Sequence, residues 1–467
     1  MDEAGEKIAQ LLVHYFPTDK DITAYLGKGH NAGDALVALS HLKQQGWNIN
    51  LQTSLSLCDF APLTHKKLTT LGLEYYQNQS QPKANSIILD GLIGIGAKGA
   101  LRGQVLELAE AIHYHRNTNG CSVVSIDIPS GVDADTGKIH KYAIIADLTL
   151  TVGYPKTGLL RSTAANHVGA LRLIKLTALQ TKNLTNNTHP LLICNHSLTR
   201  IRRPFVTHKG QAGRVGIWAG SEGMLGAAVL VASAALKAGA GLVTAFISPS
   251  LYPVLSSMMP AEVMVRPSLD PTDLMAQKFD SLVIGPGMGT PDTLQTKALF
   301  ETVKQTMVPL VLDADMLNLM SKHEVLSDLH AHCILTPHPG EMLRMFPEAA
   351  QRAREEIVRD FLLKYSVTLL YKGARTIVSH PGAPLFVNSS GTPAMATAGQ
   401  GDVLSGLIAG LCAQKYSPLE ATKTAAWLAG EASQLAIANN VETEETLTAT
   451  STLAQLPQAL SQITRRG

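Results

Sequence analysis

ATAGQGDVLSGLIAGL, residues 396–411, sets a turn of small residues directly before a continuous apolar stretch. The pattern predicts a glycine-rich turn that opens a helix, whose backbone N–H groups and positive dipole end attract an anion. Asp402 would lie at the mouth of this phosphate-binding turn, where a carboxylate can take a proton from a hydroxyl that attacks a phosphoryl group. The alternative is that Asp402 only caps the helix.

Polar groups also follow the apolar strands that lead up to this turn. Four stretches show the pattern: SLVIGPGMGT (281–290), VLDADMLNLM (311–320), ILTPHPGEM (334–342) and LLYKGARTIVS (369–379). Open α/β sheets bind ligands at the carboxyl ends of their strands, so we expect these polar groups to meet there. The sequence lacks GxxxxGK[ST], which excludes a P-loop nucleotide site.

Short apolar strands alternate with helices along the whole chain, which predicts an α/β fold with doubly wound sheets. We expect strands near 22–27, 86–92, 123–131 and 148–153 in the first half, with helices near 33–46 and 104–116. A polar stretch of low periodicity, TALQTKNLTNNTHP, then interrupts the pattern. The predicted organisation is therefore a domain over 1–176, a linker over 177–200 and a second domain over 201–467.

Composition excludes several classes of protein. Charged residues make up 16% of the 467 residues, below the roughly 25% of an average soluble domain, and 45% are hydrophobic. This apolar content excludes a largely disordered chain, and the net charge of +2 argues against a nucleic-acid-coating protein. The five cysteines are widely spaced and are expected to be buried thiols in a reducing compartment, the cytoplasm. Lys237 and several glycines interrupt the apolar run 224–247, so we predict a buried helix and strand there and no membrane partner.

The first half carries a second set of polar strand ends. GKGHNAGDALVALSHL (27–42) suits a phosphate-binding turn before a helix, with a plain strand–helix connection as the alternative. Asp90 ends the strand in ILDGLIGIGAKG (88–99), and Asp127 and Ser130 end the strand in SIDIPSGVDADTG (125–137). Such oxygen groups suit a monovalent cation or a sugar, unless both aspartates only cap turns.

Taken together, the second-half motifs GSEGMLGAA, IGPGMG, LDADMLN, LTPHPGE, YKGART and GQGDVLSG resemble the NAD(P)H-hydrate dehydratase domain of the ribokinase-like family. The resemblance implies dehydration of hydrated NADH or NADPH by phosphorylation of the added hydroxyl and elimination of phosphate. It implies ADP, or alternatively ATP, as the phosphoryl donor, together with Mg²⁺, and Asp402 as the base. The implied hydrate-binding residues are Ala227, Gly287, His338 and Asp402. The implied nucleotide-binding residues are Lys372, Gly373, Ala374, Arg375, Thr376 and Gly401.

The first-half motifs, with GYPKTGLL at 153–160, resemble the NAD(P)H-hydrate epimerase domain that is often fused ahead of the dehydratase. The resemblance implies epimerisation of the R and S hydrates, with Asp127 as acid/base, and we expect a homo-oligomer. It implies that Asn31, Asp90 and Ser130 bind K⁺. The implied hydrate contacts are His30, Asn31, Ala32, Gly33, Asp34, Gly94, Ile95, Gly96, Ala97, Lys98, Gly99, Ala100 and Asp127.

The first-half loop departs from the family pattern G-x-G-N-N-G-G-D-G at His30, Ala32 and Ala35. Alanine in place of a glycine with positive φ would cost about 1 kcal/mol or move the loop. One alternative is therefore that the first domain is a non-catalytic binding or oligomerisation module. Another is that the second domain is a vitamin or sugar kinase, although TPHPGE and KGA.T argue against it.

Overall fold

The chain forms two compact units, Met1–Asn186 and Asn187–Gly467. In this computed structural model, residues 1–73, 80–96, 99–179 and 189–466 are described. Residues 180–188 of the predicted linker lie outside them. Leu191–Ile193, which the sequence placed in the linker, forms strand β7 and pairs with β17 in the second unit. The end of the predicted linker is therefore part of a sheet.

The first unit is built on a parallel sheet of six strands with helices on both faces. The strands, in spatial order, are β2 (Asn48–Gln52), β1 (Asp21–Leu26), β3 (Ile87–Gly91), β4 (Ser122–Ile126), β5 (Leu148–Val152) and β6 (Ala170–Ile174). The helices are α1 (Asp2–Tyr15), α2 (His30–Gln44), α3 (Pro62–Thr70), α4 (Gly103–Asn119) and α5 (Ala165–Val168). Along β1, Ile22, Ala24 and Leu26 share a core with α1 and α2, whereas Tyr25 points to the α4 side. Burial of both faces explains the continuous apolar run at the start of the central strand β3, Ile87–Gly91.

The second unit contains a ten-stranded sheet. Its order is β11 (Val263–Pro267), β10 (Leu242–Ile247), β9 (Arg214–Trp218), β12 (Ser281–Ile284), β13 (Leu310–Leu312), β14 (Cys333–Leu335), β15 (Thr368–Tyr371), β16 (Ile377–Ser379), β17 (Phe386–Asn388) and β7. The strands from β11 to β15 are parallel, and β16 runs antiparallel to both of its neighbours. A separate pair joins β8 (Arg200–Ile201) to β18 (Arg465–Arg466).

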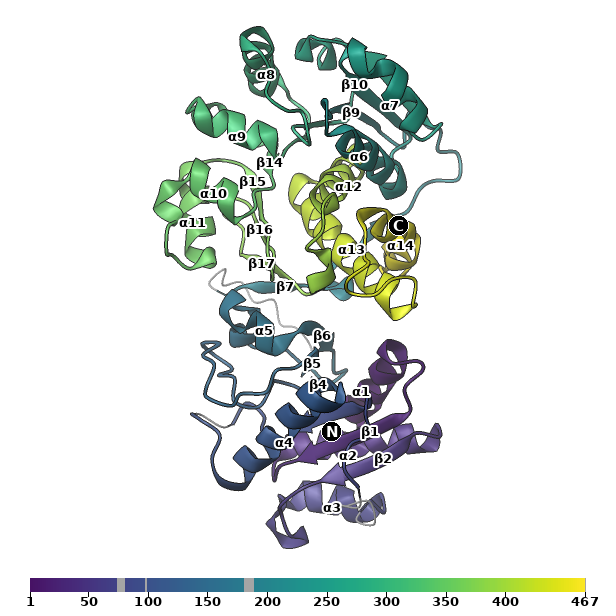
Figure 1. Cartoon of the computed structure of the whole chain (residues 1–467), viewed down its shortest axis with the longest axis vertical. Helices are drawn as coiled ribbons and strands as arrows, with labels where there is room; N and C mark the ends of the chain where they lie inside the picture. The colour runs from purple at the N-terminus through teal and green to yellow at the C-terminus, as the bar shows by residue number, and fades with distance from the viewer. Residues whose placement is uncertain (74–79, 97–98, 180–188, 467) are drawn as a thin grey trace. The chain divides into compact units, whose positions relative to one another are not determined.

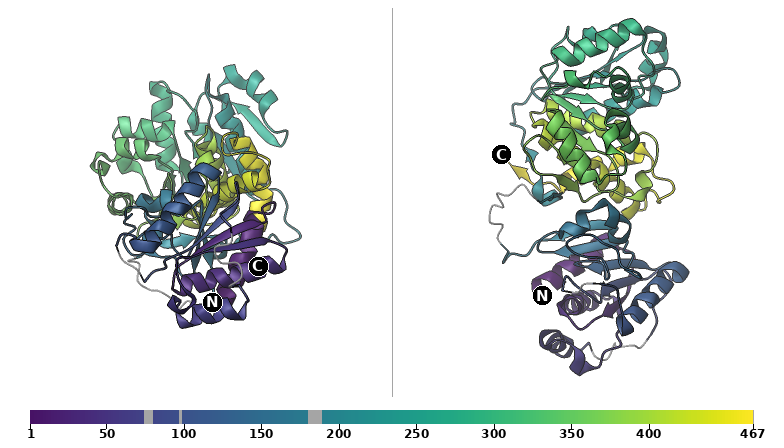
Figure 2. Two further views of the ribbon diagram at one scale, coloured as in Figure 1. Left: turned by 60° about the horizontal axis from the view of Figure 1, so that its bottom comes forward. Right: turned by 90° about the vertical axis from the view of Figure 1, so that its left-hand side faces the viewer.

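Helices cover both faces of the second sheet (Figure 1). They are α6 (Leu225–Ala238), α7 (Tyr252–Met258), α8 (Thr293–Gln305), α9 (Asp315–Lys322), α10 (Pro339–Met345), α11 (Arg354–Lys364), α12 (Gln400–Ala413), α13 (Pro418–Ala438) and α14 (Ala449–Ser461). The turned views in Figure 2 keep α12, α13 and α14 together as one layer. Residues of α6, α12, α13 and α14 share one core with the sheet.

Glycines allow α12 to cross α6 at close range. A Cβ on Gly406 would lie 2.3 Å from the Val231 carbonyl oxygen, and one on Gly410 would lie 2.7 Å from that of Ala235. Neither distance is compatible with a real side-chain carbon, so the two backbones touch here because these positions are glycine. The contact fixes α12, whose first turn carries Asp402.

Two sequence predictions concern the apolar run 224–247 and the five cysteines. The apolar run 224–247 forms α6 and β10, as predicted, and within the described residues no helix has the length and apolarity needed to cross a bilayer. Four cysteines are buried, but Cys58 is exposed, so the expectation of five buried thiols was wrong. Cys58 lies in a short surface 3-10 helix, Leu57–Asp59, where no second layer covers it.

Candidate active sites

The glycine-rich turn of the second unit opens α12, as the sequence predicts. Gly399 has φ +88°, a left-handed conformation that favours glycine, and α12 begins at the next residue. Asp402 lies in the first turn of this helix. Within the described chain its carboxylate makes no hydrogen bond, so it is not held as a simple cap. Burial, reinforced by the nearby Asp313 carboxylate, raises the pKa of Asp402 to about 6.

Lys372 connects three strand ends beside Asp402. Its Nζ donates to Asp313 Oδ1 at 2.9 Å and lies 3.7 Å from Glu341 Oε2. Burial alone would lower the pKa of Lys372, but the carboxylates of Asp313 and Glu341 more than offset it, so the pKa is raised. A Cβ on Gly401 would lie 3.6 Å from Lys372 Nζ. The ammonium therefore stays charged beside the turn at Gly401.

Asp313 holds this cluster together. Its Oδ2 accepts a hydrogen bond from Ser405 Oγ on α12 at 2.8 Å, and its Oδ1 also accepts the Ala314 N–H at 2.9 Å. The side chain of Asp313 is only 2% exposed, so its charge is stabilised by Lys372 rather than by water. Ala314 has φ +49°, a strained conformation for a residue with a Cβ. Ala314 thus separates Asp313, which contacts Lys372, from Asp315, the first residue of α9.

His338 lies at the start of α10, where it is exposed. Its Nδ1 accepts the N–H groups of Gly340 and Glu341 at 3.0 and 3.3 Å, so the ring proton of the neutral imidazole is on Nε2. Nε2 lies 3.4 Å from Glu341 Oε1, and Glu341 Oε2 accepts the His338 N–H at 2.8 Å. His338 thus caps α10. It also contacts Glu341, which in turn contacts Lys372.

The predicted hydrate contacts Ala227 and Gly287 lie against each other. Gly287 has φ +56°, and a Cβ there would lie 2.8 Å from the Ala227 Cβ. The turn continues to Gly289, whose N–H donates to Asp315 Oδ2 at 2.9 Å. A pocket of about 270 Å³ opens beside this turn, at the ends of β9, β10 and β12. Gly220, Ser221, Met288 and Thr290 are among its lining residues.

The loop between β15 and β16, residues 372–376, contains the other predicted nucleotide contacts. Gly373 and Arg375 have φ values of +142° and +58°. Thr376 Oγ1 donates to the Gly373 carbonyl at 2.9 Å and closes the loop. The structure thus brings Lys372, Gly401 and Asp402 together, while 373–376 continue from Lys372 as a tight turn.

In the first unit, Asp90 ends β3 at the centre of a hydrogen-bond network. Its Oδ1 accepts from Ser130 Oγ at 2.7 Å and from the Leu92 N–H at 3.2 Å. Its Oδ2 accepts from Ser125 Oγ at 2.8 Å and from the Ser130 N–H at 2.9 Å. Burial raises the pKa of Asp90 despite these hydrogen bonds. No Lys, Arg or His in the described residues forms an ion pair with this carboxylate.

Asn31 lies beside the same network at the start of α2. Its Nδ2 donates to the carbonyl oxygens of Ile126 at 2.9 Å and Ile93 at 3.4 Å, and Ser130 Oγ is also 3.4 Å from the Ile93 oxygen. Asn31, Asp90 and Ser130 are therefore close together. Ala32 and Ala35 lie inside α2 without positive φ, so the glycine replacements in this loop cause no backbone strain.

Asp127 follows β4 with φ +65°, an uncommon conformation for a residue other than glycine or asparagine. Its Oδ1 accepts the Val152 N–H at 2.9 Å and contacts Lys156 Nζ. Asp34 is near enough to interact with Asp127, and burial raises the pKa of Asp34 to about 6. The carboxyl groups of Asp34 and Asp127 and the Lys156 ammonium are thus close enough to interact.

The 94–100 segment is only partly described, since Ala97 and Lys98 lie outside the described residues. Gly94, Gly99 and Ala100 line a pocket of about 100 Å³. Ile95 and Gly96 are exposed, as is His30 at the start of α2. Gly94 approaches Asn31, since a Cβ on Gly94 would lie 3.6 Å from Asn31 Cγ. The segment therefore connects the Asn31 network with this pocket.

Each half of the chain matches a known protein family. Residues 215–456 match the family model described as NAD(P)H-hydrate dehydratase, and residues 1–158 match that of the YjeF-related protein N-terminus. A bifunctional NAD(P)H-hydrate repair enzyme of Moorella thermoacetica is 34% identical over 92% of this chain and 87% of its own length. This chain belongs to the bifunctional NAD(P)H-hydrate repair enzyme family. The prediction of fused epimerase and dehydratase domains is confirmed.

A solved ribokinase-like structure supports the α/β fold expected of the second half. A ribokinase-like protein of Enterococcus faecalis covers 61% of this chain and 99% of its own, with 24% identity and a TM-score of 0.53. An ADP/ATP-dependent NAD(P)H-hydrate dehydratase of Bacillus subtilis, crystallised with ATP/Mg²⁺, covers 57% of this chain and 95% of its own, with 27% identity and a TM-score of 0.48. The predicted ribokinase-like fold of the second half is confirmed.

Sequence reasoning missed two charged residues at the sites of this repair-family chain. Lys156 contacts Asp127, although only its place in GYPKTGLL drew attention to it. Glu341 connects His338 with Lys372 from within LTPHPGE. The available signal was a charge of opposite sign near each candidate acid or base. The paired residues, however, lie 29 positions apart in the sequence for Lys156 and Asp127, and 31 positions apart for Lys372 and Glu341.

Proposed function

We propose that the second unit dehydrates NAD(P)H hydrate with Asp402 as the general base. The added hydroxyl attacks the terminal phosphorus of the nucleotide, its proton passes to the Asp402 carboxylate, and the shortened nucleotide leaves with the electrons of the broken P–O bond. Phosphate then leaves the ring with the C–O electron pair while the neighbouring carbon loses a proton, which restores the double bond. The observation that carries this proposal is the unpaired Asp402 carboxylate beside Lys372 at the opening of α12.

The nucleotide would bind along Lys372, Gly401 and the 373–376 turn. Lys372 offers a positive charge, and the α12 N-terminus offers N–H groups and a favourable dipole to the phosphates. Ala227, Gly287 and His338, which follow β9, β12 and β14, would contact the hydrate at the same edge of the sheet. Bringing both substrates to one strand edge places the hydroxyl and the phosphorus in reach of each other.

Mg²⁺ fits this site as a companion of the nucleotide. Within the described residues no three acidic, histidine or cysteine side chains are grouped to hold a metal ion by themselves. Mg²⁺ usually needs only one or two protein carboxylates beside the substrate phosphates and water. The Asp315 carboxylate, which is close enough to interact with Asp402, would supply one, and the ion would neutralise phosphate charge.

The first test is the recovery of NADH absorbance from NADH hydrate, with ADP and ATP supplied separately. We expect recovery with at least one nucleotide in the wild-type chain and none with Asp402→Asn. Glu301→Gln on α8, a matched change at an exposed carboxylate, should leave the rate unchanged. No recovery with either nucleotide would reject the dehydratase and favour a kinase that retains its phosphorylated product.

For the first unit we propose epimerisation of the hydrate with Asp127 as acid/base. The contact with Lys156 and the Val152 N–H hold its carboxylate in one direction. The alternative is a binding or oligomerisation module without catalysis, for which the loop changes at His30, Ala32 and Ala35 were the argument. These three residues lie in α2 without positive φ, so the loop changes give no sign of backbone strain that would argue against catalysis.

K⁺ fits beside Asp90 in the first unit, since this buried carboxylate has no cationic side-chain partner in the described residues. The ion would be held by oxygens of Asn31 and Ser130 and by the Ile93 and Ile126 carbonyls, close to the Asp90 charge. Replacing K⁺ by a tetraalkylammonium salt should slow epimerisation and lower the melting temperature of the first unit. No effect on either would reject the K⁺ site.

A further inference from the structure

The outer side of the 372–376 loop is held by one arginine. Arg354, the first residue of α11, donates from Nη1 to the carbonyls of Ala374 at 2.7 Å and Arg375 at 3.3 Å. Its Nη2 donates to the carbonyls of Tyr371 at 2.7 Å and Lys372 at 2.9 Å. One guanidinium group thus binds four carbonyl oxygens between the end of β15 and the loop.

The position of Arg354 on α11 is unfavourable for the helix itself. A positive charge at a helix N-terminus opposes the helix dipole, and acidic residues are preferred there. The guanidinium carbon also lies 4.5 Å from the centre of the Tyr371 ring, which fixes its plane. The hydrogen bonds to the carbonyls therefore stabilise the Arg354 side chain at a position where the helix dipole opposes its charge.

The backbone of the 372–376 loop has positive φ values beside this guanidinium. Gly373 has φ +142°, and a Cβ on it would lie 3.1 Å from Arg354 Nη2. Arg375 also has positive φ. Because the carbonyls turn toward Arg354, the N–H groups of Gly373 and Ala374 have no acceptor among the described residues. Consecutive N–H groups of this kind form an anion-binding concavity.

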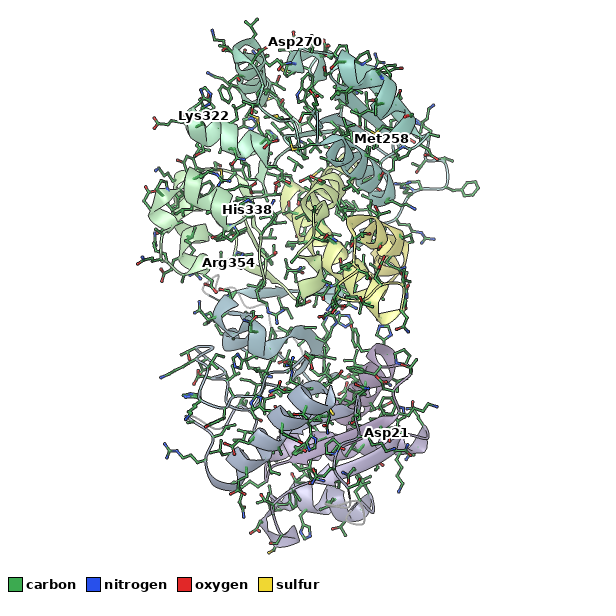
Figure 3. All side chains as sticks on the ribbon, in the orientation of Figure 1. Asp21, Met258, Asp270, Lys322, His338 and Arg354 are labelled. Carbon is green, nitrogen blue, oxygen red and sulfur yellow. The ribbon has the colours of Figure 1, made fainter. Side chains whose placement is uncertain are left out.

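We propose that Arg354 is a positioning residue for the nucleotide: it holds the carbonyls of Lys372, Ala374 and Arg375 on one side of the loop so that the N–H groups and the Lys372 ammonium face the phosphates. This proposal rests on the proposed nucleotide site. Arg354 and His338, labelled in Figure 3, lie at the starts of neighbouring helices α11 and α10. Arg354 itself donates to carbonyls and does not need to touch the nucleotide.

The test compares Arg354→Met, Arg354→Lys and the control Arg359→Met, which lies on the exposed part of the same helix. Methionine keeps an apolar stem without donors, and lysine keeps the charge without the planar fork. Affinity for ADP and for ATP, each with Mg²⁺, is measured by titration calorimetry on the full chain, and KM is measured for nucleotide and hydrate separately. Circular dichroism reports folding.

We expect Arg354→Met to weaken nucleotide binding at least tenfold, with the KM for the hydrate within twofold of wild type. Arg354→Lys should weaken it at least fivefold, which keeps the proposal testable if the methionine variant does not fold. Affinity within twofold of wild type in the folded variants, or an equal rise in both KM values, would overturn the positioning role. A wild-type chain that binds neither nucleotide would instead overturn the proposed function.

Discussion

At the residue scale, Asp402 links the electrostatics of the second unit to a pH profile. Its pKa is raised to about 6, and a general base must be ionised to accept a proton. The rate of dehydration should therefore rise as the pH increases through about 6. Lys372 lowers this pKa, so Lys372→Met should move the rising limb to higher pH and also weaken nucleotide binding. Single-turnover rates at saturating nucleotide between pH 5 and 8 measure the position of the limb, and the same rates over a range of nucleotide concentrations measure the affinity.

The direction of that shift separates the acid–base role from a purely structural one. Asp313 raises the pKa of Asp402, so Asp313→Asn should move the limb to lower pH. Opposite shifts in the two variants are expected from charge alone. A limb that stays in place in both variants would mean that another group, and not Asp402, is titrating.

Lys156 gives a second prediction at the residue scale. It contacts the Asp127 carboxylate and also donates to the Val152 carbonyl at 2.9 Å. Lys156→Met should slow epimerisation strongly, on the order of a hundredfold if the carboxylate moves by about 1 Å. Dehydration of the preferred epimer should be unchanged. Exchange between the R and S hydrates, followed by chromatography, measures the first rate, and Lys141→Met in the same unit is the control.

At the scale of elements, the sequence was informative where one stretch carries the whole signal. The strands before Asp402 and Lys372, and the turn that opens α12, follow from local runs of apolar residues and glycines. The three-residue strands β7 and β17 did not stand out, whereas the equally short β13 and β14 were marked by the polar motifs that follow them. The pairs Lys156–Asp127 and Arg354 with the 372–375 loop depend on the tertiary fold, so no local pattern identifies them.

The crossing of α6 and α12 is an element-scale feature that can be tested directly. Gly406→Ala would place a Cβ against the Val231 carbonyl and push the helices apart. Overpacking of this kind typically costs about 1–3 kcal/mol of folding stability, and it should also lower the dehydration rate because α12 carries Asp402. Denaturant unfolding gives the stability. Gly226→Ala, a helical position with nothing near the added Cβ, is the control and should stay within about 1 kcal/mol of wild type.

At the scale of the whole molecule, the two candidate sites lie in separate compact units with separate cores. Asp127 belongs to the first unit and Asp402 to the second, so the proposed roles give each reaction its own acid/base group. We therefore expect the two activities to be separable by single substitutions.

Mixing two variants tests this independence. Asp127→Ala should convert only the preferred epimer, and Asp402→Asn should epimerise without regenerating NADH. If the hydrate passes between sites through solution, an equimolar mixture of the two variants should regenerate NADH from both epimers within the time that wild type needs, before spontaneous epimerisation contributes. NADH absorbance follows the reaction. A mixture that stops at the fraction of preferred epimer, while wild type goes to completion, would show that both sites must be intact in the same chain.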